Sequence, residues 1–173
     1  MNDLLLLATL LGRPAHGYAL KKRIGQITGH GEMHNNLVYP LLKRFVAAGW
    51  VSRQAVPGER GQTRERYALT AKGRQELLRK LGEFTKKDAA TENAFRLRVG
   101  LFAVLDAEAR EKILAGREAW LTERAKKLAN LTAAMNLGQW GEEVVEFLRS
   151  QVEAEAQWIG ALRKKALGHK GRK

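Results

Sequence analysis

Residues 35–50, with the sequence NNLVYPLLKRFVAAGW, constrain the fold because they join an amphipathic helical pattern to a proline. The apolar face of a helix over this stretch consists of Val38, Leu41, Leu42 and Phe45. A proline fits the first turn of a helix, because the earliest N–H groups have no helical partner there. Pro40 therefore predicts a helix that begins near Asn35 or Asn36, with asparagine as its N-cap.

Helical and strand-like segments flank this helix in an informative order. The apolar spacing predicts helices over residues 3–11 and 18–27, with the turn GRPAHG between them and a glycine-rich connection from the second helix to Asn35. Residues 50–69 then read as two strands around the turn PGERGQT, and Thr70 can cap the helix that follows. Helix, turn, helix and basic hairpin is the order of a winged helix-turn-helix module. In such a module the first residues of the recognition helix meet base edges in DNA.

Positive charge is concentrated where this module lies. The net charge of the protein is +13. Residues 1–85 contain 14 Lys/Arg and six Asp/Glu, a net charge of +8, whereas residues 86–162 contain 11 and 12, a net charge of −1. Residues 163–173 contain six basic residues and no acidic one. This asymmetry indicates a polyanionic partner, either nucleic acid or an anionic membrane surface.

From about residue 89 onward the sequence predicts only helices. Asp106 is expected to cap a long helix that reaches about Met135, and residues 136–138 break it before a final helix from Trp140 to about Leu167. The apolar stripe of that final helix consists of Trp140, Val144, Leu148, Val152, Ile159 and Leu162. Such a stripe suits helix–helix packing, and it would leave an exposed apolar face on a monomer, so we expect a homodimer.

The fold class expected is therefore mainly α, with an N-terminal winged helix-turn-helix that carries a two-stranded β wing and a C-terminal helical dimerisation domain. The expected domains are a DNA-binding domain over residues 1–85, a helical dimerisation and effector domain over 89–167, and a basic tail over 168–173. The apolar run Leu4–Leu11 is far shorter than the roughly 18 apolar residues of a membrane-spanning helix and reads as a core helix. No signal peptide or cysteine is present, which favours a cytoplasmic protein without a membrane partner.

Three motifs in this order resemble the PadR family of bacterial transcriptional repressors. They are LLLLATLLGRPAHGYALKKRI, VYPLLKRFVAAGWV and RERYALTAKGRQEL, and together they cover about residues 4–79. The segment EAEAQWIGALRKK resembles the final helix of the longer PadR branch more loosely. The resemblance implies a repressor that binds operator DNA as a dimer, and it implies that Tyr39 contacts the DNA backbone. Two departures stand out: Asn36, Leu37 and Val38 stand where the family usually has glycine, serine or threonine, and leucine before Tyr39, and the wing tip lacks the usual proline.

The residues expected to contact DNA combine the start of the recognition helix with basic groups around it. Asparagine amides can pair with adenine edges, Leu37 can meet a thymine methyl in place of the family's hydroxyl contact, and Lys/Arg hold phosphates. The expected DNA-binding residues are Lys21, Lys22, His34, Asn35, Asn36, Tyr39, Lys43, Arg60, Gln62, Thr63, Arg64 and Arg66. The expected partner is double-stranded DNA with a palindromic operator, because a two-fold symmetric dimer matches two half-sites.

The resemblance also implies a small aromatic, phenolic-acid-like effector that releases the operator. PadR proteins bind such molecules near the dimer interface or between the two domains. The candidate effector-binding residues are Trp50, Phe95, Phe102, Trp120 and Trp158. The alternative for each of these aromatic residues is packing in a core or a dimer interface.

Other classes of protein find little support in the residues. No Ser/His/Asp arrangement, P-loop or Rossmann glycine pattern is present, so we expect no enzyme and no cofactor. His30 and His34 are four residues apart, but Gly31 and the loop-like context argue against a metal site. A non-specific nucleic-acid or anionic-surface binding protein, which would use the tail and the basic helix, remains the alternative function.

Overall fold

The computed structural model describes residues 2–28, 34–57 and 62–168. The chain divides into two compact units, Met1–Glu83 and Phe84–Lys173. Three segments with expected features lie outside the described residues: residues 29–33 with His30, residues 58–61 with Arg60, and residues 169–173 of the basic tail. The functions expected for the N-terminal and C-terminal parts of the chain stay predictions.

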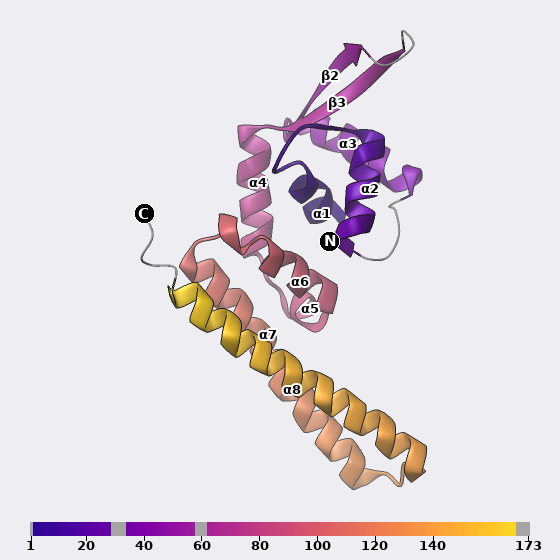
Figure 1. The fold of residues 1–173 in the computed structure, drawn as a ribbon, viewed down its shortest axis with the longest axis vertical. Helices are drawn as coiled ribbons and strands as arrows, with labels where there is room; N and C mark the ends of the chain where they lie inside the picture. Colours follow the sequence, from indigo (N-terminus) through magenta and orange to yellow (C-terminus); the bar gives the residue numbers. More distant parts are fainter. Residues whose placement is uncertain (1, 29–33, 58–61, 169–173) are drawn as a thin grey trace. The chain divides into compact units, whose positions relative to one another are not determined.

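The first unit surrounds a small apolar core with four helices and three short strands (Figure 1). These elements are α1 (Asn2–Thr9), β1 (Ala15–His16), α2 (Gly17–Thr28), α3 (Asn35–Ala47), β2 (Val51–Pro57), β3 (Thr63–Leu69) and α4 (Ala71–Gly82). The side chains sealed in this core include Leu6, Leu7, Leu20, Ile24, Leu42, Phe45, Leu77 and Leu81. The hairpin of β2 and β3 extends away from the helices, so most of its side chains are exposed.

The sheet has one strand more than the wing requires. Its antiparallel order is β1-β3-β2. The pair β2–β3 runs in register from Val51 opposite Leu69 to Pro57 opposite Thr63, and β1 adds Ala15 opposite Tyr67. Residues 15 and 16, which the sequence places in a turn, thus form a two-residue strand. Ala15 is buried, and this pairing fixes the start of α2 against the wing.

Helix α3 begins where Pro40 indicates, but its N-cap is not the expected asparagine. His34 is the N-cap of α3, with no hydrogen bond from its side chain, and the expected asparagine cap is wrong. The carbonyl oxygen of His34 accepts from the N–H groups of Leu37 and Val38 at 3.0 and 3.2 Å. The helical hydrogen bonds therefore begin at His34, and both Asn35 and Asn36 lie inside the helix. Pro40 is the sixth helical residue and cannot donate a hydrogen bond to the carbonyl of Asn36.

The base of the wing is tied to α4 through Thr70. The hydroxyl of Thr70 donates to the carbonyl oxygens of Gly49 and Trp50 at 2.7 and 3.1 Å, and accepts from the N–H of Gly73 at 3.0 Å. The helix cap expected at Thr70 is thereby confirmed. A Cβ atom at Gly73 would lie 1.9 Å from the carbonyl oxygen of Trp50, so only glycine permits this approach.

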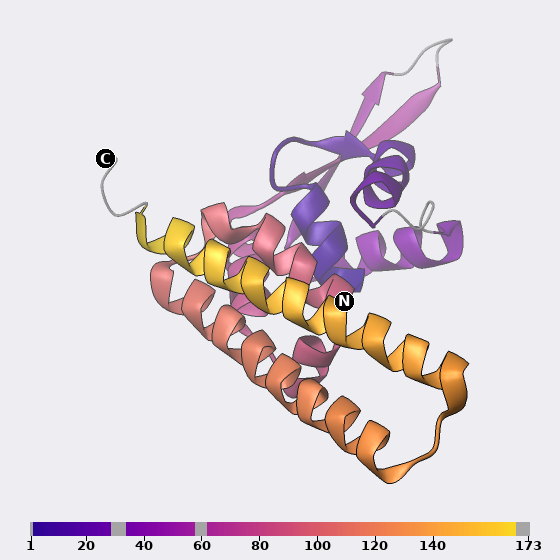
Figure 2. The ribbon, with the colours of Figure 1, turned by 60° about the horizontal axis from the view of Figure 1, so that its bottom comes forward.

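The second unit is entirely helical in its described part (Figure 2). Its elements are α5 (Lys86–Ala90), α6 (Glu92–Gly100), the 3-10 helix η2 (Phe102–Val104), α7 (Ala107–Ala134) and α8 (Gly138–Gly168). Asp106 caps α7 as expected and accepts from the N–H of Ala109 at 2.7 Å. A left-handed glycine at residue 138, with φ of +61°, turns the chain so that α8 packs along α7.

The apolar stripe predicted on α8 divides into a buried and an exposed part. Ile159 is sealed against the rest of the unit, and Leu148, Val152 and Leu162 are half-buried. Val145, which the predicted stripe did not include, is also buried. Trp140 is 78% exposed, and Val144 is also exposed. None of the helices in the described ranges combines the length and the hydropathy that crossing a bilayer requires.

Candidate nucleic-acid interface and helical-unit pocket

The first half of α3 presents the residues expected to read DNA. Val38, Leu41, Leu42 and Phe45 turn inward and are buried, as the periodicity predicts. The remaining side chains of this part of the helix lie at the surface: Asn36, Leu37, Tyr39, Pro40 and Lys43. His34 is also exposed at the N-cap, whereas the side chain of Asn35 lies outside the described residues. An exposed polar helix start above an apolar inner face is the arrangement that a groove-reading helix requires.

Tyr39 lies over the junction between β1 and α2. Its side chain is 47% exposed, and it borders a hollow of about 430 Å³. The other residues around this hollow are His16, Gly17, Tyr18, Arg64, Glu65 and Tyr67. Recognition helix, α2 and wing therefore meet at this hollow.

Strand β3 supplies the basic side of the wing. Gln62, Thr63, Arg64 and Arg66 are exposed. Glu65 is engaged by its neighbours: it accepts from the hydroxyl of Tyr67 at 2.9 Å and pairs with Arg53 at 3.4 Å. Burial and the hydrogen bond to Glu65 raise the pKa of Tyr67 to about 12, so the phenol stays neutral at physiological pH. The charge of Glu65 is thus partly neutralised within the wing itself.

The two lysines predicted on α2 lie in different surroundings. Lys22 is exposed, whereas Lys21 is half-buried with its Nζ 6.0 Å from the centre of the Tyr18 ring. Tyr18 is itself largely exposed, a feature that the sequence reasoning did not single out. Its position, directly after the predicted turn GRPAHG and shortly before Lys21 and Lys22, is the sequence feature that could have indicated its exposure.

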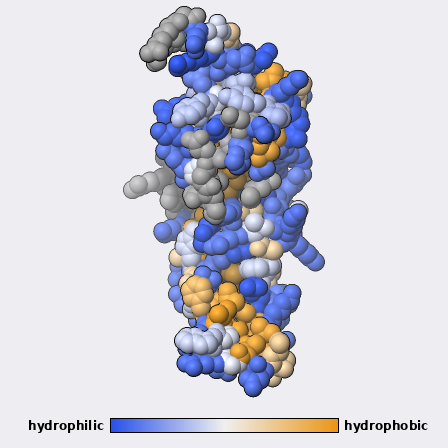
Figure 3. All heavy atoms as spheres, turned by 90° about the vertical axis from the view of Figure 1, so that its right-hand side faces the viewer, coloured by the Kyte–Doolittle hydropathy of each residue, from blue (hydrophilic) through white to orange (hydrophobic). Residues whose placement is uncertain are grey.

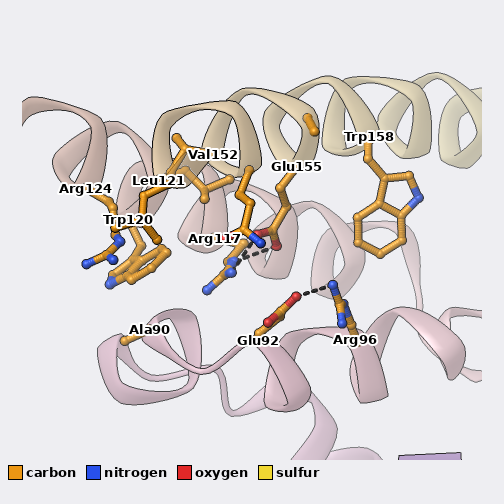
Figure 4. A pocket seen from close by; sticks show the side chains of 13 residues that line it. Ala90, Glu92, Arg96, Arg117, Trp120, Leu121, Arg124, Val152, Glu155 and Trp158 are labelled. Atoms are coloured by element: carbon orange, nitrogen blue, oxygen red, sulfur yellow. Dashed lines mark hydrogen bonds and ion pairs between the residues drawn. The ribbon is translucent and has the colours of Figure 1, made fainter. Parts of the chain in front are cut away.

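Two of the candidate effector residues border a pocket of about 640 Å³ in the second unit (Figure 4). Trp120 extends from α7 and Trp158 from α8, while Glu92 and Arg96 approach from α6. Further lining residues include Arg117, Leu121, Arg124, Gln151, Val152 and Glu155. Aromatic walls beside several guanidinium groups suit a planar ligand that carries polar or anionic substituents.

Arg117 organises this pocket, although the sequence reasoning missed it. Its side chain is 3% exposed and forms two hydrogen bonds to the carboxylate of Glu155, at 2.8 and 2.7 Å. A third bond, at 2.5 Å, reaches the carbonyl oxygen of Ala89 at the end of α5. The guanidinium also lies over the Trp120 ring at 4.4 Å. One buried cation therefore joins α5, α7 and α8.

The remaining aromatic candidates lie elsewhere. Phe95 is fully buried and meets the edge of Trp158 at 5.8 Å between ring centres, so it supports the pocket wall from behind. Phe102 lies in η2 and does not line the pocket. Trp50 belongs to the first unit, where its ring packs against Phe45 at 5.4 Å and beneath Lys80.

A second cation in this unit supports the short helix α5. Arg98 is buried and pairs with Asp88 at 3.4 Å, while Thr85 and Asp88 form a capping box. Burial alone would raise the pKa of Asp88, but the hydrogen bonds from Thr85 and the charge of Arg98 lower it overall. Burial also lowers the pKa of Arg98, and Asp88 opposes that change.

An exposed apolar cluster lies at the end of the second unit where α7 meets α8 (Figure 3). It consists of Leu131, Met135, Trp140, Val144 and Phe147. The predicted stripe of α8 includes Trp140 and Val144. It does not include Phe147, because steps of four residues lead from Val144 to Leu148. Among the described residues no group of three His, Cys, Asp or Glu side chains could hold a metal ion.

Comparisons with known proteins concern mainly the first unit. Residues 6–79 match the model of the transcriptional regulator PadR-like family. A proposed transcriptional regulator from Thermoplasma acidophilum is 33% identical over 44% of this chain and 72% of its own, with a TM-score of 0.41. A PadR-like transcription factor from Bacteroides fragilis is 24% identical over 43% and 71%, with a TM-score of 0.40. Bacillus subtilis PadR, solved in complex with operator DNA, is 15% identical over 95% and 98%, with a TM-score of 0.47. No curated protein matches the sequence.

Proposed function

The chain belongs, through residues 6–79, to the PadR-like family of transcriptional regulators, and from this premise we propose that it is a sequence-specific repressor that binds double-stranded DNA. The observation that carries the proposal is the exposed first half of α3 beside the exposed arginines of β3. The net charge of +8 on residues 1–85 supplies the long-range attraction to a polyanion.

The proposed roles follow from the chemistry of each side chain. The amide of Asn36 pairs with an adenine edge, and Leu37 meets a thymine methyl, because both lie on the exposed side of the recognition helix. Tyr39 contacts a backbone phosphate, as the family resemblance implies. Lys22, Lys43, Arg64 and Arg66 hold phosphates on either side and provide affinity without sequence preference.

The exposed apolar cluster supports a homodimer. A monomer would leave Trp140, Val144 and Phe147 in water beside Leu131 and Met135, and exposed apolar groups gathered in this way are typical of interaction surfaces. Two copies related by a two-fold axis would read the two halves of a palindromic operator, with half-sites separated by one or more turns of about 34–36 Å.

Selection of bound DNA from a random pool tests the DNA-binding proposal. We expect enrichment of a palindrome by the wild-type protein, and loss of operator preference over random DNA in the Asn36→Ala and Tyr39→Ala variants. Asn130→Ala, a matched change at an exposed position of α7, should bind as the wild type does. Failure to enrich a palindrome, with equal binding by all variants, would favour the non-specific nucleic-acid or anionic-surface binder.

We further propose that a small aromatic, phenolic-acid-like effector binds the pocket between Trp120 and Trp158 and releases the operator. Release requires that the effector bind more tightly to an arrangement of the dimer that misfits the operator. Titration of the protein–operator complex with a panel of phenolic acids tests this. Trp120→Ala should abolish the response of a responsive complex, whereas Asn130→Ala, outside the pocket lining, should retain it. A Trp120→Ala variant with an unchanged response would place the effector elsewhere.

A further inference from the structure

Gly17 and Tyr39 approach each other more closely than any other residue type at position 17 would permit. A Cβ atom built on Gly17 would lie 2.8 Å from Cε1 of Tyr39, 3.1 Å from its hydroxyl oxygen and 3.2 Å from Cζ. The aromatic ring of the recognition helix therefore rests on the bare backbone at the start of α2. Because all three of these neighbouring atoms belong to Tyr39, a methyl group at residue 17 would require the ring to move.

The backbone of Gly17 does not itself require glycine. Among the described glycines, positive φ angles occur only at Gly49 and Gly138. Gly17 is the first residue of α2, and an alanine is favoured over glycine in a helix when nothing obstructs its side chain. The ring of Tyr39 is thus the neighbour that excludes a side chain here.

The platform beneath the ring is fixed to the wing. His16, the residue before Gly17, pairs with Arg66 in the β1–β3 ladder, and its Nδ1 lies 2.9 Å from the carbonyl oxygen of Glu65. Gly17 therefore holds a set distance from the strand that carries Arg64 and Arg66. The position of a ring that rests on Gly17 is therefore set relative to the wing as well as relative to α3.

We propose that Gly17 is a positioning residue for operator binding: by lacking a side chain, it seats the Tyr39 ring so that its hydroxyl meets a DNA phosphate. This inference rests on the proposed function, since it assumes that Tyr39 contacts DNA. A methyl group at residue 17 displaces the ring and moves the hydroxyl away from the phosphate. The remaining contacts of α3 and of the wing stay in place.

A double-mutant cycle tests the positioning role. Gly17→Ala should weaken binding to the selected operator about as much as Tyr39→Ala does, by roughly tenfold, which is the order of one good charge-assisted hydrogen bond. In the Tyr39→Ala background the same Gly17→Ala change should alter affinity by less than about twofold, because no ring remains to be displaced. Gly12→Ala is the matched control, since nothing lies within 4 Å of a Cβ atom at that position.

A measurement without DNA separates this inference from the proposed function. In NMR spectra the wild type should show a nuclear Overhauser effect between the Gly17 α-protons and the Tyr39 ring, and Gly17→Ala should shift the ring resonances whereas Gly12→Ala should not. If Gly17→Ala shifts the ring resonances but Tyr39→Ala leaves operator affinity unchanged, the ring packs on Gly17 but does not contact DNA. Loss of affinity in Tyr39→Ala with none in Gly17→Ala, or additive losses in the cycle, would overturn the positioning role.

A folding failure would also be informative. If Gly17→Ala does not fold, the Gly17→Ala/Tyr39→Ala double variant decides the question. Recovery of the fold in the double variant supports the steric relation between the two residues, and a double variant that remains unfolded contradicts it.

Discussion

The arginines of strand β3 and those that join the helices of the second unit lie in opposite surroundings. In the first unit Arg64 and Arg66 lie exposed along β3, on a part of the chain with an excess of eight positive charges. In the second, Arg117 is sealed against Glu155, Arg98 against Asp88, and Arg163 bonds to both Glu111 and Glu118. The same side chain thus serves as an exposed cation along β3 and as a connector between helices in the second unit.

This difference follows from the carboxylates available to each unit. Residues 86–162 hold one more acidic than basic residue, so a buried guanidinium finds a partner nearby. A buried ion pair carries a large desolvation cost, which only complete hydrogen bonding offsets. The pairs of the second unit meet that demand and fix its helices, whereas exposed charges such as those along β3 contribute little to stability.

Breaking the connector should give the largest effect. Arg117→Ala leaves Glu155 with no partner in a largely buried place and removes the bond to the carbonyl of Ala89, so we expect a loss of about 3–5 kcal/mol in the unfolding free energy of the second unit. Urea denaturation followed by tryptophan fluorescence at fixed protein concentration measures it. Arg124→Ala, over the same Trp120 ring but with no carboxylate partner among the described residues, should cost less than about 1 kcal/mol. Equal losses in the two variants would contradict the comparison.

An intermediate effect is expected from the Asp88 carboxylate. Asp88→Asn keeps an acceptor for Thr85 but removes the charge beside buried Arg98, so we expect a loss of about 1 kcal/mol at neutral pH. The folded state lowers the pKa of Asp88 below its ordinary value of 3.8. Its contribution is therefore present above pH 3.8 and is lost as the pH falls through the folded-state pKa.

The pH dependence provides the check on Asp88. Stability curves of the wild type and of Asp88→Asn, measured by thermal unfolding between pH 7 and pH 3, should converge at the acidic end. Glu153→Gln at an exposed position on α8 serves as the control and should leave the separation between the two curves unchanged. A constant separation between the wild-type and Asp88→Asn curves would mean that the charge is not the stabilising feature.

The smallest effect on stability, but a distinct one on binding, is expected at the wing. Arg66→Ala should leave the unfolding free energy within about 0.5 kcal/mol of the wild-type value, because the side chain is exposed. The slope of log K against log salt concentration for operator DNA should become shallower by about 1, as for the loss of one phosphate contact. Arg149→Ala in α8 should leave that slope unchanged. An unaltered slope for Arg66→Ala would remove the arginine from the DNA contact surface.

Local signals in the sequence predicted most of the fold. Thr70 and Asp106 cap helices as expected, and Pro40 limits the start of α3 to within one residue of its observed position. The features that escaped depend on partners distant in sequence. Strand β1 has only two residues and exists because it pairs with β3 about 50 positions later, and no local periodicity can reveal such a pairing.

The candidate sites were predictable to a similar extent. Helical periodicity placed Asn36, Tyr39 and Lys43 at the surface, because burial of one face exposes the other. Trp120 and Trp158 do border one pocket, but composition alone could not separate them from Trp50, which packs in the first unit. The Arg117–Glu155 pair spans 38 residues, so its two charges read as ordinary exposed positions of separate helices until α7 and α8 are folded together.

The contacts of Thr70 couple the position of α4 to that of the wing. The carbonyl oxygen of Trp50 accepts hydrogen bonds from the hydroxyl and the N–H of Thr70. The N–H of Trp50 donates to the carbonyl oxygen of Phe45 near the end of α3. With Gly73 in steric contact at the same place, α4 cannot rotate without carrying the wing and the end of α3 along. Helix α4 ends at Gly82, immediately before the second unit begins, so a displacement of α4 would act on the wing and on the end of α3 through Thr70 and Trp50.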